Sequence, residues 1–202
     1  IGRCRVFAPG WLENESIWLH MEYKYLLEIL KQGLFEEFYR EFRGVLVPFQ
    51  DPQRYGRSIL ENSSFLVSSA FGKKELHGNG FVARLSGSTA EFLEIWLLMN
   101  LGKEPFYLDR NNALCLRLRP VLAGWLFDRR GKYSFSFLSK VRINYHNPQK
   151  KNTFGANAAK VSRIVFKDAD GNPVEISGES IPSPYSGQIR QRLVREIDAY
   201  LY

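Results

Sequence analysis

The residues Ser86-Gly87-Ser88-Thr89 combine small side chains with hydroxyl groups immediately before an apolar run, residues 92–99. Ser88 and Glu91 have the spacing of a capping box, so we predict that a helix begins here. The first N–H groups of a helix lack partners within it and carry a partial positive charge. Gly87 would allow an anion to approach this backbone closely. The segment therefore predicts a phosphate cradle, with simple helix capping as the open alternative.

Other side chains with suitable chemistry lie far from this segment in the sequence. His20 stands early in an apolar stretch, where an imidazole is either a hydrogen-bonded core residue or an anion ligand. Arg57 and Glu61 lie in a long irregular region, where they form either a surface ion pair or part of a binding loop. The three histidines lack metal-ligand spacing to one another, so we predict no metal site.

The first hundred residues follow helical patterns. Residues 16–31 predict a helix that is apolar nearly all round, with Asn14 or Ser16 as its cap and Gly33 after its end. Residues 34–43 predict a second helix after a very short turn. Residues 48–85 hold no period and are rich in Pro, Gly, Ser and Asn, which is typical of a functional loop region. The helix that begins near Ser88 should end at Gly102.

After Pro105 the pattern changes to that of strands. We predict strands at residues 114–118, 133–138 and 141–145, and a hairpin of residues 161–167 and 174–177 around Asp168-Ala169-Asp170-Gly171-Asn172. That turn lacks the closing glutamate of a calcium loop, which favours ordinary turn chemistry. Ile189, Leu193, Ile197 and Leu201 are spaced four apart and predict an amphipathic helix over residues 188–202.

The composition describes an ordinary folded protein of 202 residues, with 45% hydrophobic and 24% charged residues. No apolar run reaches the ~20 residues needed to span a membrane, and no signal peptide is visible, so we expect a cytoplasmic protein. The two cysteines, Cys4 and Cys115, are expected to be reduced thiols.

The net charge of +7 is unevenly distributed along the chain. Residues 110–163 contain 12 Lys and Arg but one acidic residue, Asp128, whereas both flanks are slightly acidic. The charges alternate with apolar residues, as in Leu116-Arg117-Leu118-Arg119. This alternation favours a solvated strand face over a nucleic-acid groove.

Three segments in this order resemble the cellobiose-phosphorylase family, glycoside hydrolase family 94. The segments are residues 13–20 (ENESIWLH), residues 55–65 (YGRSILENSSF) and residues 85–92 (LSGSTAEF). The resemblance covers the whole chain. It implies an α+β fold in which residues 1–104 are the closing helices of an (α/α)6 barrel. It also implies that residues 105–202 are a C-terminal antiparallel β-sandwich of jelly-roll type with a terminal helix.

The resemblance implies an inverting phosphorylase that cleaves β-linked gluco-oligosaccharides with inorganic phosphate and needs no cofactor. In this resemblance, the family's phosphate-binding positions are matched by His20, Ser86, Gly87 and Ser88. The sugar-binding loop contains Glu61 together with Arg57. The family's general acid lies upstream, so we expect no catalytic residue in this chain, no activity from it alone, and the rest of the same enzyme as its partner. A homodimer stays open, and we expect neither nucleic-acid nor membrane partners.

Two positions depart from the family pattern. The family's sugar-contacting lysine falls at Leu12 and its loop glutamine falls near Val67, and neither side chain can donate to a sugar hydroxyl. Cellobiose is therefore disfavoured as the substrate, and the motifs are closer to the β-1,2-oligoglucan phosphorylase branch. A non-catalytic carbohydrate-binding module is the alternative, because 14% of the residues are aromatic. That function requires an exposed row, for which Trp125, Tyr133 and Tyr145 are the candidates.

Overall fold

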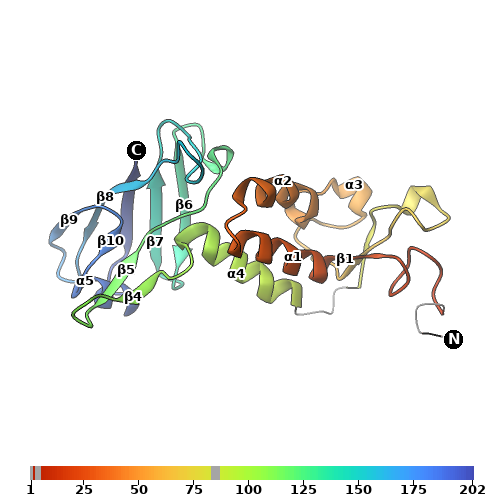
Figure 1. Cartoon of the computed structure of the whole chain (residues 1–202), viewed down its shortest axis with the longest axis horizontal. Coiled ribbons are helices and arrows are strands. Elements are labelled where there is room, and N and C mark those ends of the chain that lie inside the picture. Colours follow the sequence, from red (N-terminus) through yellow and green to blue (C-terminus); the bar gives the residue numbers. More distant parts are fainter. Residues whose placement is uncertain (1, 3–5, 83–86) are drawn as a thin grey trace. The chain divides into compact units, whose positions relative to one another are not determined.

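The computed structural model describes residue 2, residues 6–82 and residues 87–202, with side chains given from residue 90 onward in the last range. The chain divides into two compact units, Ile1–Trp96 and Leu97–Tyr202. Most helices belong to the first unit and two of the three sheets to the second (Figure 1). The fold is mixed, and this segregation along the chain is compatible with the α+β class.

Three longer helices occur before residue 102: α1 (Leu19–Lys31), α2 (Phe35–Val45) and α4 (Gly87–Leu101). In α1 the buried residues recur at helical spacing and include Leu19, Tyr23, Leu26, Leu27 and Leu30. Gly33 follows α1 with a φ of +77°, which explains why the helix ends where the sequence predicted. The predicted second helix begins one residue later and ends two residues later than predicted. The helix α4 begins one residue before Ser88 and ends directly before Gly102, as predicted.

The predicted start of the first helix was wrong by three residues. Ile17–Trp18 forms a strand, β1, that pairs with β2 (Phe65–Leu66) in antiparallel fashion. The backbone N–H of Leu19 donates to the carbonyl of Ser64, so the start of α1 is fixed by this sheet. Trp18 occupies the cap position, and no side chain caps the helix there. Neither Asn14 nor Ser16 therefore has the predicted role.

The region between residues 47 and 82 is more ordered than its composition indicated. It contains η2 (Val47–Phe49), α3 (Pro52–Tyr55), β2, η3 (Lys74–Leu76) and β3 (Gly80–Phe81). The strands β1, β2 and β3 form a three-stranded antiparallel sheet in that order. Periodicity could not reveal these strands, because each is only two residues long.

The second unit is built on a five-stranded sheet in the order β6-β7-β11-β8-β9. Its strands are β6 (Lys132–Phe137), β7 (Val141–His146), β8 (Val161–Lys167), β9 (Pro173–Ser177) and β11 (Glu196–Leu201). A smaller sheet has the order β10-β5-β4, from β4 (Phe106–Leu108), β5 (Leu114–Arg117) and β10 (Ser180–Ile181). A short η4 (Gly124–Leu126) follows β5 in the chain.

The four strands predicted in the middle of this unit, and the hairpin partner β9, are confirmed within a residue or two. The expectation of a purely antiparallel sheet was wrong, because β11 pairs with β7 in parallel and with β8 in antiparallel fashion. One face of the large sheet is buried through alternate residues such as Ile143, Ile164 and Ile197.

The predicted terminal helix was also wrong. Residues 185–190 form the short helix α5 (Tyr185–Arg190), and the chain then ends in β11. Ile197, Ala199 and Leu201 are buried whereas the residues between them are more accessible, which is the period of a strand. A spacing of four fits both a helix and a strand face, so Ile197 and Leu201 alone could not distinguish the two.

Cys115 is a free, buried thiol, and Cys4 lies outside the described residues. Among the helices of the described chain, none combines the length and the apolar character that crossing a bilayer requires.

Candidate functional site

His20 is the second residue of α1, directly after the β1 strand. The ring is half-buried, and its Nδ1 atom is buried without a hydrogen-bond partner among the described residues. Trp18 lies 5.5 Å from this ring and Phe65 lies 6.1 Å away, edge-on, both measured between ring centroids. A buried ring nitrogen without a partner is costly, so a core role for His20 lacks the hydrogen bond it would require.

The start of α4 lies at the same end of the first unit as His20. Figure 1 shows α1 and α4 side by side and running in the same direction. The ring of Tyr23 lies 6.3 Å from that of Phe92, and Lys31 pairs with Glu94 at 2.9 Å. His20 is about one turn before Tyr23 in α1, and the start of α4 is about one turn before Phe92. The two helix starts are therefore neighbours.

Of the predicted cradle residues, Gly87 and Ser88 are the first two residues of α4, so the helix begins about two residues before the point that a capping box with Ser88 as the N-cap predicts. Ser86 lies outside the described residues, and the orientation of the Ser88 side chain is not described either. The convergence of the His20 ring with the backbone N–H groups of residues 86–88 stays a prediction. The 15-residue α4 supplies the helix-terminal partial charge that such a cradle needs.

Arg57 and Glu61 lie on the loop between α3 and β2. The Nε of Arg57 donates to the carbonyl of Gly80 at 2.6 Å, and its Nη1 lies 3.5 Å from Oε2 of Glu61. Both side chains remain partly accessible, at 38% for Arg57 and 59% for Glu61. Arg57 is therefore fixed to β3 through its Nε atom, while the charged ends of both side chains remain accessible to a ligand.

Tyr55 holds this loop in place through the hydrogen bonds of its side chain. Its side chain is buried, and its hydroxyl lies 2.7 Å from both the carbonyl of Glu61 and the hydroxyl of Ser63. The hydroxyl donates to the carbonyl, and desolvation raises the pKa of Tyr55 above its ordinary value. Ser64 then continues into β2, which pairs with β1 beside His20. One small sheet thus connects Arg57, Glu61 and His20.

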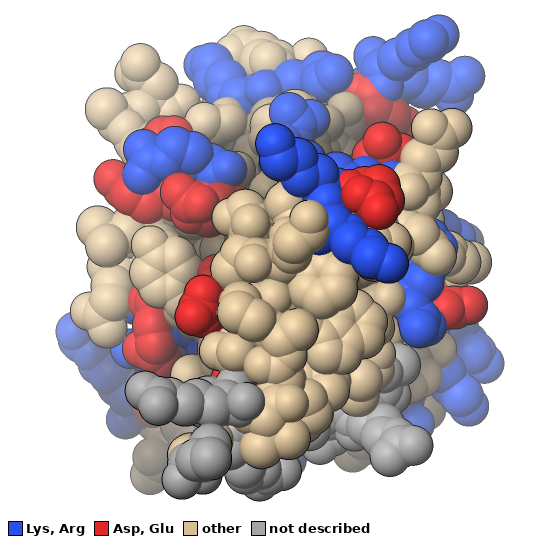
Figure 2. All heavy atoms as spheres, turned by 90° about the vertical axis from the view of Figure 1, so that its right-hand side faces the viewer, with Lys and Arg blue, Asp and Glu red and all other residues tan. Residues whose placement is uncertain are grey.

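Sequence reasoning missed an aromatic cluster around this sheet. Trp11 stacks on Phe81 with centroids 4.1 Å apart, and Phe65 stacks on the same Phe81 at 5.6 Å. Phe71 and Trp18 pack against the cluster. Figure 2 faces this end of the first unit and shows uncharged side chains across the centre, with Lys, Arg, Asp and Glu above them. The clue in the sequence was the recurrence of aromatic residues throughout an irregular region.

The three residues predicted as an aromatic row for a carbohydrate-binding module do not form one. Tyr145 is fully buried, and its hydroxyl donates to the carbonyl of Asn100 at 2.6 Å. Burial raises the pKa of Tyr145 well above its usual range. Tyr133 is half-buried and Trp125 is 38% exposed. Of the three residues only Trp125 is exposed, so packing within the unit, the other interpretation, accounts better for Tyr133 and Tyr145.

The basic block follows the predicted strand alternation. Leu116 and Leu118 are fully buried, whereas Arg117 and Arg119 between and after them reach solvent. Arg117 lies over the ring of Tyr107, and Arg119 pairs with Glu179. Both guanidinium groups therefore interact with side chains of the same unit.

The turn at Asp168 makes the hydrogen bonds of an ordinary turn. Its Oδ1 accepts from the backbone N–H groups of Asp170 and Asn172, at 3.0 and 2.8 Å. Within the described ranges, no group of three or more His, Cys, Asp and Glu side chains is arranged to hold a metal ion.

No protein-family model matches this chain, and no curated protein matches it.

Proposed function

We propose that this chain is the C-terminal part of an inverting glycoside phosphorylase acting on β-linked gluco-oligosaccharides. In this proposal residues 1–104 close an (α/α)6 barrel and residues 105–202 form a β-sandwich domain. The observation that carries the proposal is the buried, unpartnered Nδ1 of His20 in the first turn of α1, a helix that lies beside α4 (Figure 1). The free thiol of Cys115 suits the cytoplasm, which we propose as its compartment.

The two kinds of donor suit a phosphate ion together. A helix start offers several backbone N–H groups and a partial positive charge, while an imidazole adds one directed N–H. Trp18 and Phe65 beside His20 keep water from one side of the ring and strengthen a hydrogen bond that it donates. Ser86, Gly87 and Ser88 are the positions that we assign to the helix start.

We assign the sugar side of the site to Arg57 and Glu61. A carboxylate accepts hydrogen bonds from sugar hydroxyl groups, and a guanidinium group donates to them. The anchoring of Arg57 to the carbonyl of Gly80 fixes the position of both groups before a ligand binds. Such preorganisation lowers the entropic cost of binding.

The proposed reaction is an inverting displacement. A general acid, which we place outside this chain, protonates the glycosidic oxygen as the bond to the anomeric carbon breaks. Phosphate attacks that carbon from the opposite face, in the place that water occupies in a hydrolase. His20 and the start of α4 would hold the phosphate in line and would transfer no proton.

The test is a titration of the 202-residue chain with inorganic phosphate, followed through the imidazole NMR signals. We expect the ring signals of His20 to shift at saturation. The ring signals of His77 should not shift, because its Nε2 is already engaged with the carbonyl of Phe71 at 2.7 Å. A His20→Ala variant should bind phosphate at least about tenfold more weakly, whereas His77→Ala should not. Unchanged affinity in His20→Ala would count against the proposal.

A further inference from the structure

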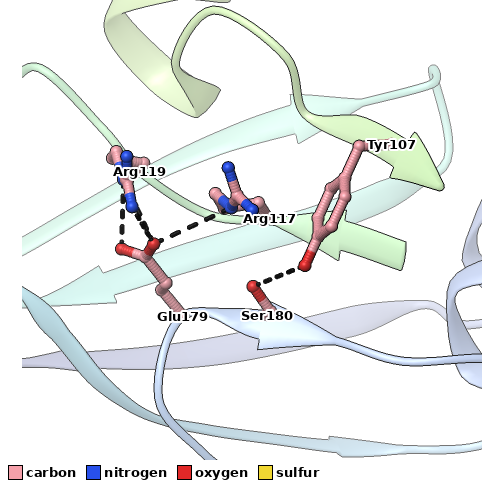
Figure 3. A network of polar contacts seen from close by, with 5 residues as sticks. All are labelled: Tyr107, Arg117, Arg119, Glu179 and Ser180. Carbon is pink, nitrogen blue, oxygen red and sulfur yellow. Dashed lines mark hydrogen bonds and ion pairs between the residues drawn. The ribbon is translucent and has the colours of Figure 1, made fainter. Parts of the chain in front are cut away.

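Two arginines of the second unit converge on one carboxylate. Arg117 ends β5 and Arg119 follows two residues later, so both side chains leave the same side of the extended backbone. Figure 3 shows both pointing toward Glu179, which directly precedes β10. The pairing of Arg117 with Ser180 in the β5–β10 ladder brings Glu179 beside them. The cluster therefore has two guanidinium groups and one carboxylate.

Arg119 takes most of the hydrogen-bonding capacity of Glu179. Its Nε lies 3.1 Å and 3.3 Å from the two carboxylate oxygens, and its Nη2 also donates to Oε1. The Nε of Arg117 lies 3.8 Å from Oε1, which is too far for a hydrogen bond. This Nε atom is buried and has no hydrogen-bond acceptor within the described chain.

The Arg117 guanidinium group is held in place without such an acceptor. Its central carbon lies 4.1 Å from the centre of the Tyr107 ring, and the hydroxyl of Tyr107 lies 3.1 Å from that of Ser180. Figure 3 shows Tyr107 and Ser180 beside the arginines. About a third of the Arg117 side chain is accessible, and a cation that an aromatic face holds in one position is preorganised for an anion.

Two cavities adjoin this cluster. One of about 360 Å³ is lined by Arg119, Lys160, Glu179 and Thr153 among others, which is within the size range of small-ligand pockets. The other, of about 220 Å³, is lined by Lys103, Glu104, Arg117 and Arg119 among others. Arg119 borders both. Their linings together contain four cationic and two anionic side chains.

We propose that the two cavities bind one small hydroxylated oxyanion, of the class of phosphorylated or carboxylated sugars. Its oxyanion would accept hydrogen bonds from Arg117 and Lys103, and its hydroxyl groups would donate to Glu179. A ligand with anionic groups alone would be repelled by Glu179, and a neutral sugar would leave the positive charges of Arg117 and Lys103 without a counter-charge. This site is independent of the proposed phosphorylase function, because none of its residues belongs to that function's phosphate or sugar positions.

Isothermal titration of the 202-residue chain with glucose 6-phosphate, glucose and inorganic phosphate tests this inference. We expect glucose 6-phosphate to bind at least about tenfold more tightly than either part, a difference of about 1.4 kcal/mol. Arg117→Gln should weaken its binding by at least about tenfold. Arg163→Gln is the matched control and should leave affinity within about twofold, because Arg163 also lies 4.1 Å over a tyrosine and pairs with a glutamate but borders neither cavity.

Equal affinity of wild type and Arg117→Gln, or equal losses in both arginine variants, would overturn the inference. Inorganic phosphate that shifts the amide signals of residues 116–119 at concentrations as low as glucose 6-phosphate would also overturn the assignment of a hydroxylated ligand. Amide NMR signals of the wild-type chain give a measurement that needs no variant. The amide signals of residues 116–119 and 179–180 should shift on titration with glucose 6-phosphate. Shifts confined to other residues would contradict the site. His20→Ala should leave the glucose 6-phosphate shifts of these signals unchanged, which separates this test from that of the phosphorylase.

Discussion

Replacing Tyr145 with Phe removes one hydroxyl from the centre of the second unit and changes almost nothing in side-chain volume. Tyr145 is fully buried, and its hydroxyl donates to the carbonyl of Asn100 at 2.6 Å. Loss of the donor leaves a carbonyl without that bond in a buried setting, which costs about 1–3 kcal/mol. For a domain of about a hundred residues, each kcal/mol lowers the melting temperature by roughly 4–8 °C.

Thermal unfolding of the 202-residue chain, monitored by circular dichroism, measures this loss. Tyr202→Phe is the control, because Tyr202 is 68% exposed and its substitution should change stability by less than about 0.5 kcal/mol. The experiment also distinguishes two roles for Tyr145. As a surface residue that stacks on sugars it would lose glucan binding and keep its stability, whereas as a core residue it loses stability. A melting temperature within about 1 °C of wild type would refute the core assignment.

Two further predictions concern a buried phenol and the corrected end of the chain. Desolvation raises the pKa of Tyr23 from 10.0 to about 12, so the folded state keeps its proton longer than the unfolded state. The free energy of unfolding should therefore fall between pH 10 and 12, by about 2–3 kcal/mol in total, and Tyr23→Phe should remove most of this slope in alkaline denaturant titrations. Ile197→Ala should cost about 2–5 kcal/mol in a denaturant titration, because Ile197 is fully buried in β11. Leu193→Ala should cost less than about 0.5 kcal/mol, because Leu193 is 51% exposed; equal losses in these two variants would instead favour a terminal helix.

The parts of the fold that could be predicted are those with long, unambiguous periods. The strand at residues 161–167 was predicted to the residue, and α4 was located to within about two residues at its start, and at its end by Gly102. In both cases local preferences and the tertiary structure agree. The end of the chain illustrates the opposite case. The spacing of Ile197 and Leu201 fits both a helix and a strand. The segment forms a strand because its backbone pairs with β7 on one side and β8 on the other.

The candidate site was harder to predict because its geometry depends on long-range pairing. Ile17 and Trp18 continue the helical pattern of the residues after them, yet they pair with residues 65 and 66. Nothing in the local sequence of either segment indicates this contact. The pairing shortens α1 so that His20 lies in its first turn, beside the ring of Phe65. A prediction from periodicity alone places His20 one turn further inside a helix.

Gly80 shows how packing and the candidate site depend on the same residue. A Cβ at this position would lie less than 3.0 Å from the Tyr55 ring and from the Ser63 hydroxyl, so only glycine allows this close approach. The carbonyl of the same residue accepts the hydrogen bond from Arg57. Tyr55 in turn holds the backbone of Glu61. The positions of Arg57 and Glu61 therefore follow from the core contact between β3 and Tyr55, and a larger residue at position 80 would displace both.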